Sequence, residues 1–101
     1  MGIDFAVEEL YATGWSDLDS TGCSHHVDGR GYPRPERVRQ EFASSGFDLA
    51  IRRIDIFNCF RAEWSNGDAD TSGSVVGRSE AEAAVYALAQ FRRQLTAEAV
   101  S

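Results

Sequence analysis

Two segments in the first half of the chain carry the apolar spacing of helices. In residues 4–13, Asp4 can cap the first turn and Gly14 can end the helix. The apolar residues of this segment form no single narrow stripe, so we expect it to pack loosely. A second helix begins at Pro35, because proline suits the first helical position, and it ends at Gly46. Between the two helices, residues 16–34 are predicted to form one long polar loop.

From residue 47 the period changes from helical to extended. Residues 47–51 alternate apolar with polar or small side chains, as in a half-buried strand. The phase shifts at Arg52 and Arg53, which predicts either a bulge or a tight turn there, with apolar alternation resuming afterwards at Ile54 and Ile56. A second strand is predicted over residues 59–64, with Phe60, Ala62 and Trp64 on one face. A short third strand over residues 73–77 completes an antiparallel meander.

The last predicted helix has the clearest boundaries. Ser79 and Glu82 have the spacing of a capping box, in which the serine caps the helix and the glutamate lies three residues later. Apolar side chains then recur at helical spacing on one stripe. These are Ala81, Ala84, Val85, Leu88, Phe91 and Leu95.

The order helix, loop, helix, three strands, helix predicts an α+β fold. Helices would pack on one face of a three-stranded antiparallel sheet. The length fits a single domain over residues 1–101. Within it we expect an N-terminal helix and long loop (1–34), a compact α-β-β-β-α unit (35–95) and a tail (96–101).

The predicted unit over residues 35–95 resembles the double-stranded-RNA-binding domain, and GRSEAEAAVYAL resembles the signature of that family's last helix. The matching positions are Gly77, Ser79, Ala83 and Ala87. The resemblance implies the fold, and it implies lysines that hold RNA phosphates. Where the family has those lysines, this chain has Glu80, Ala81 and Ala84, so we expect no nucleic-acid partner and keep a degenerate RNA-binding-like module only as an alternative.

Charge strengthens that expectation. The net charge is −6, and all ten basic residues are arginines. Residues 1–29 contain six acids and no arginine, whereas residues 30–63 contain seven arginines and five acids. The acidic segment can neutralise the basic one within the molecule, which opposes binding to phosphates. No apolar run has the length of a membrane span and the start lacks a signal peptide, so we expect a cytoplasmic protein with no membrane partner and with Cys23 and Cys59 reduced.

The loop over residues 17–28 contains several metal-ligating side chains. The spacing of Cys23, His25, His26 and Asp28 does not match the paired ligands of structural zinc sites. The segment DLDSTGCSHHVD follows the calcium-loop formula from its first aspartate to its last. A calcium or zinc site in this loop is therefore an alternative, and otherwise we expect no cofactor. Its candidate ligands are Asp17, Asp19, His25, His26 and Asp28.

Tyr32, Arg34 and Arg37, beside two prolines, form an aromatic–arginine cluster of the kind enriched at protein interfaces. No catalytic set of residues is apparent, since the glycine-rich phosphate motifs and the H-E-x-x-H motif are missing from the sequence. The leading hypothesis is therefore a small non-catalytic domain that acts through contacts with a protein partner or through self-association as a homodimer.

Overall fold

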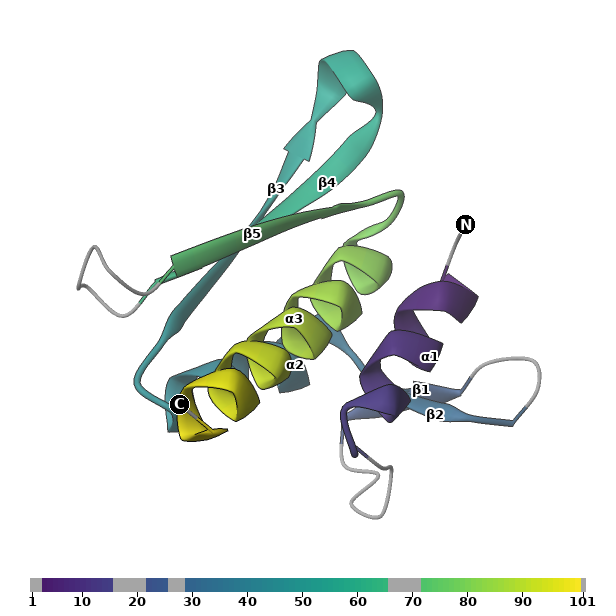
Figure 1. Ribbon diagram of the computed structural model, residues 1–101. Helices are drawn as coiled ribbons and strands as arrows, with labels where there is room; N and C mark the ends of the chain where they lie inside the picture. The colour runs from purple at the N-terminus through teal and green to yellow at the C-terminus, as the bar shows by residue number, and fades with distance from the viewer. Residues whose placement is uncertain (1–2, 16–21, 26–28, 66–71, 101) are drawn as a thin grey trace.

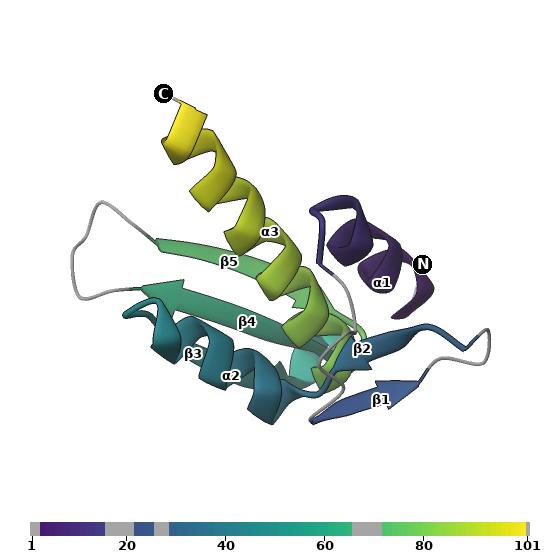
Figure 2. The same ribbon diagram turned by 90° about the horizontal axis from the view of Figure 1, so that it is seen from below.

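The computed structural model describes residues 3–15, 22–25, 29–65 and 72–100, with side chains as far as residue 94. It has the predicted α+β composition (Figure 1). The helices are α1 (Ile3–Ala12), α2 (Pro35–Ser44) and α3 (Glu80–Val100). The main sheet is antiparallel, in the order β3 (Asp48–Ile54), β4 (Cys59–Ser65) and β5 (Ser72–Gly77). All three helices lie on one side of this sheet (Figure 2).

The expected phase shift at Arg52 and Arg53 is neither a bulge nor a turn. The pairing of β3 with β4 runs without interruption from Asp48 opposite Ser65 to Ile54 opposite Cys59. The chain turns later, through a 3₁₀ turn (Asp55–Phe57) that ends at Asn58 in the left-handed conformation, with φ of 50°. Asparagine tolerates this conformation better than most residues, which explains the position of the turn.

The long loop predicted over residues 16–34 contains a second sheet. Strands β1 (Cys23–His25) and β2 (Gly31–Pro33) form a short antiparallel hairpin. The Tyr11 hydroxyl donates a hydrogen bond to the Gly31 carbonyl at 2.7 Å and so ties the hairpin to α1. Strands of three residues are too short to show alternation, and glycine and proline are poor strand formers, so the sequence pattern did not reveal them.

The core lies between the sheet and α3. Phe91 of α3 stacks on Phe42 with ring centroids 4.4 Å apart and meets Phe47 edge-on at 4.7 Å. Trp64 reaches the same cluster from β4 and donates its indole N–H to the Gln94 side chain at 3.2 Å. Leu10 and its apolar neighbours on α1 are fully buried in this core, so the prediction that the first helix packs loosely was wrong.

Helix α3 begins at the predicted capping box. The Glu82 N–H donates to the Ser79 hydroxyl at 3.1 Å, and the Glu82 carboxylate accepts from the Arg78 N–H at 2.9 Å. The helix continues to Val100 and so includes the predicted tail over residues 96–101 as far as residue 100. Alanine, glutamate and leucine are strong helix formers and carry the helix onward. Among the described residues, no helix is both long and apolar enough to cross a membrane.

Candidate interaction surface

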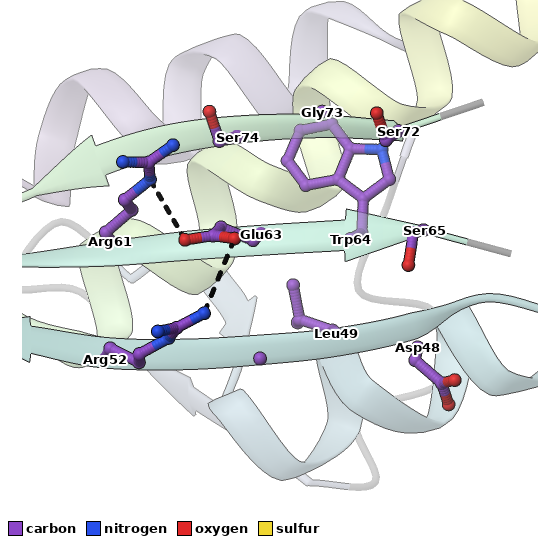
Figure 3. Close-up of a pocket in the computed structure, with 11 residues that line it drawn as sticks. Asp48, Leu49, Arg52, Arg61, Glu63, Trp64, Ser65, Ser72, Gly73 and Ser74 are labelled. Carbon is purple, nitrogen blue, oxygen red and sulfur yellow. Dashed lines mark ion pairs between the residues drawn. The ribbon is translucent and has the colours of Figure 1, made fainter. Parts of the chain in front are cut away.

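The sheet face opposite the helices is polar. Glu63, in the central strand β4, lies between two guanidinium groups, 3.1 Å from Arg61 and 3.6 Å from Arg52 (Figure 3). These side chains and nearby serines line a shallow depression of about 470 Å³, whose lining contains no histidine or cysteine. Because Glu63 is held by two arginines, the face resembles a solvated, internally neutralised surface more than a site for chemistry.

The two edges of the main sheet differ in charge. On β3 the side chains of Asp48, Arg52 and Arg53 are exposed, and charges of this kind protect an edge from pairing with another strand. The β5 edge, with the sequence SGSVVG, has no charged residue and no proline. Within the described residues β5 pairs only with β4, so the backbone N–H and C=O groups on its other side have no strand partner.

Glycines at positions 73 and 77 leave β5 with few side chains on the helix side of the sheet. A Cβ atom at Gly73 would overlap the indole of Trp64. A Cβ atom at Gly77 would lie 2.6 Å from the backbone nitrogen of Ala83, in the first turn of α3. Both glycines face the helices, because they pair with core-side residues Trp64 and Phe60. Val75 is therefore the single side chain of β5 on the helix side.

Apolar grooves adjoin this slender strand. One depression, of about 300 Å³, lies between α1, α3 and β5 and is lined by Phe5, Val75 and Tyr86 among others. A second, of about 550 Å³, lies at the C-terminal end of β5 and shares Val75 and Tyr86 with the first. Phe5 is 51% exposed and Val76 is 55% exposed, so part of the apolar surface beside β5 is open to solvent. We call the two depressions together the β5 groove.

A separate apolar feature lies at the turn between β3 and β4. Ile56 is 89% exposed and Phe57 is 75% exposed, more than any other large apolar side chains among the described residues. They protrude from the end of the hairpin and line none of the three depressions described above. We call this pair the hairpin tip.

The predicted interface residues Tyr32, Arg34 and Arg37 meet around the small hairpin. Tyr32 is half-buried and packs against the core. Arg34 donates to the Ser24 hydroxyl at 3.1 Å, and Arg37 lies 3.3 Å from the Glu41 carboxylate and 3.9 Å from the Cys23 sulfur. The contacts with Ser24 and Cys23 attach β1 to the start of α2. Whether the cluster also binds a partner stays a prediction.

Most of the predicted metal loop lies outside the described residues. The candidate ligands outside the described residues are Asp17, Asp19, His26 and Asp28. His25 is described, at the exposed end of β1 opposite Gly31. Elsewhere in the described ranges, no group of three or more histidine, cysteine, aspartate or glutamate side chains could hold a metal ion. A calcium or zinc site in the loop therefore stays a prediction.

The positions that carry lysines in the RNA-binding family have other roles here. Ala84 is fully buried in the core, where a lysine could not reach a phosphate. Glu80 lies 3.7 Å from Arg39 and so joins α3 to α2. Neither position offers positive charge to a nucleic acid.

Comparison of the chain with models of protein families, with curated proteins and with solved structures gives no match. The surfaces described above are therefore the basis for a functional proposal.

Proposed function

We propose that this protein is a non-catalytic domain that acts by binding another protein. The observation that carries the proposal is the β5 edge, where backbone groups with no strand partner in the described part of the chain lie beside an exposed apolar groove. An uncharged open edge attracts strands from other chains, and natural sheets usually protect such edges unless they are used. The charged β3 edge of the same sheet has that protection, which makes its lack on β5 specific.

Two measurements test this proposal. Native mass spectrometry of the untagged protein reads its oligomeric state, and affinity capture from the native cell extract reads its partners. We expect the tagged domain to retain a protein in stoichiometric amount after washing in about 500 mM NaCl, because apolar contacts are insensitive to screening. A monomer that retains no protein under these conditions would overturn the proposed function.

Native mass spectrometry and an RNA-binding assay distinguish the two alternatives. A calcium or zinc site in the 17–28 loop predicts stoichiometric metal in the native mass spectrum, lost when His25, His26 and Asp28 are replaced together. An RNA-binding module predicts retention on double-stranded RNA that falls steeply as salt rises from about 50 to 200 mM. We expect no such retention on RNA, since the lysine positions of that family hold Glu80, Ala81 and Ala84 in this chain.

A further inference from the structure

We infer that the β5 groove binds one short extended segment of a partner protein, which adds to the sheet as a fourth strand beside β5. This inference rests on the proposed function and specifies its mode. In an antiparallel pair, every second residue directs both its N–H and its C=O toward the same neighbour. About three residues of β5 therefore direct these groups outward, to where no strand of the described chain lies.

The groove indicates the side chains of the added segment. Alternate side chains of a strand beside β5 would point toward the helices, into the space lined by Phe5, Val75 and Tyr86. At Gly73 and Gly77 the space on the helix side is filled by the Trp64 indole and by the first turn of α3, so the groove lies beside Val75. The segment that fits has an apolar residue on that side, next to Val75.

The charges of the groove give no reason to expect a cation in the segment, and Arg78, an exposed cation of the same lining, disfavours one. Glu9 pairs with Arg93 across the gap between α1 and α3. Glu82 is 3% exposed, and its carboxylate accepts the Arg78 N–H. Both carboxylates of the groove lining are thus partnered within the chain, so neither requires a cation from the segment.

A single segment is a simpler occupant of this edge than a second copy of the protein. Two β5 strands paired antiparallel would be related by a two-fold axis perpendicular to the sheet, which places both helical layers on the same side. Figure 2 shows α3 crossing the sheet obliquely, with its C-terminal half reaching past β5. Each α3 would then extend over the other copy's β5, on the same side of the joined sheet. A single extended segment brings no second helix to that side.

The test uses random ten-residue segments displayed on phage and selected on the immobilised full-length protein. Enriched segments are synthesised, and their dissociation constants are measured for the wild type, Phe5→Ser and Phe57→Ser. The two variants make the same chemical change at exposed phenylalanines, one in the groove and the other at the hairpin tip. We expect Phe5→Ser to weaken binding on the order of tenfold, and Phe57→Ser to leave it within about twofold.

Amide hydrogen exchange of the wild type provides a readout that needs no variant. A bound segment should slow exchange at alternate amides of β5 and leave those of β3 unchanged. Enriched segments that protect the hairpin tip or the Arg52–Glu63–Arg61 face instead would overturn the inference. Such a result would still leave the proposed function standing, because a protein contact would exist at another surface. Failure to enrich any segment that protects β5 would also overturn the inference, whatever partner the cell extract yields.

Discussion

The two edge strands of the main sheet are close in length but opposite in character. Strand β3 has seven residues and places Asp48, Arg52 and Arg53 at its surface. Strand β5 has six residues, all of them serine, glycine or valine. On the row that includes Phe60, β3 contributes the exposed Arg53 and β5 contributes Gly77. Thus the same sheet has one edge protected by charged side chains and one edge without any charged side chain.

The difference follows from what packs against each strand. Close approach of Trp64 and of the first turn of α3 requires glycine at two positions of β5, so this strand contributes little to the core besides Val75. Strand β3 instead directs Leu49 and Ile51 against the core. The close packing of α3 on the sheet therefore also leaves β5 with few side chains and with a groove beside it. In this molecule, one sheet edge packs two apolar side chains against the core, and the other adds only Val75 and has no second strand partner among the described residues.

The largest expected effect is from Gly77→Ala. The added Cβ atom would lie 2.6 Å from the Ala83 nitrogen and 2.9 Å from its Cα, both of them backbone atoms that cannot move without displacing α3. We expect the free energy of unfolding to fall by about 3 kcal/mol, measured by urea denaturation. The matched change on the other edge is Arg53→Ala on the same row, which should cost less than about 1 kcal/mol because its ion pair with Asp55 is exposed. Equal costs at both positions would show that the edges do not differ in packing.

Much of the fold was predictable from the sequence, because the elements concerned are long or have strong end signals. The capping box of Ser79 and Glu82 and the alternation of Phe60, Ala62 and Trp64 correctly gave the start of α3 and the core-facing side of β4. The small hairpin was missed because three-residue strands carry no period. The straight passage of β3 through Arg52 and Arg53 was missed because pairing with β4 overrides a local break in the apolar pattern.

The candidate site was less predictable than the fold. The clusters that attract notice in the sequence contain histidines, cysteines and arginines, and the described ones, such as Arg34 and Arg37, make contacts within the chain. The β5 groove depends on where α1 lies relative to β5, and no local pattern in a single sequence gives that position. One signal was present, namely the lack of any charge in SGSVVG, but its meaning required knowing that β5 is an edge strand.

A second prediction concerns a variant with fewer charged side chains on the β3 edge. The double variant Asp48→Thr, Arg52→Thr loses one acid and one base, so the net charge stays at −6. With its edge charges reduced, we expect the variant to associate at high concentration, measured by sedimentation velocity. Asp48→Glu, Arg52→Lys keeps both charges and should sediment as the wild type does. If the threonine variant also sediments as the wild type does, charge on β3 is not what distinguishes the two edges.

The smallest expected effect concerns Tyr86, which lines both depressions of the β5 groove. Burial raises the pKa of its phenol above the ordinary value of 10.0, and the nearby Glu82 carboxylate raises it further. The folded state thus favours the protonated phenol. Its contribution to stability is complete below pH 10 and is lost as the pH rises through the raised pKa of the folded state.

A segment bound in the groove should raise the pKa of Tyr86 again, because it removes water from the phenol. The measurement is the ultraviolet titration of tyrosine with and without an enriched segment, taken as the difference between the wild type and Tyr86→Phe. Tyr32→Phe is the matched control, since Tyr32 lies on the small hairpin and lines none of the described depressions. By the same linkage, binding to the wild type should weaken above pH 10 and binding to Tyr86→Phe should not. If these two proteins have identical pH profiles, the bound segment lies away from Tyr86. The β5 edge would then lack protecting charges without being the binding site.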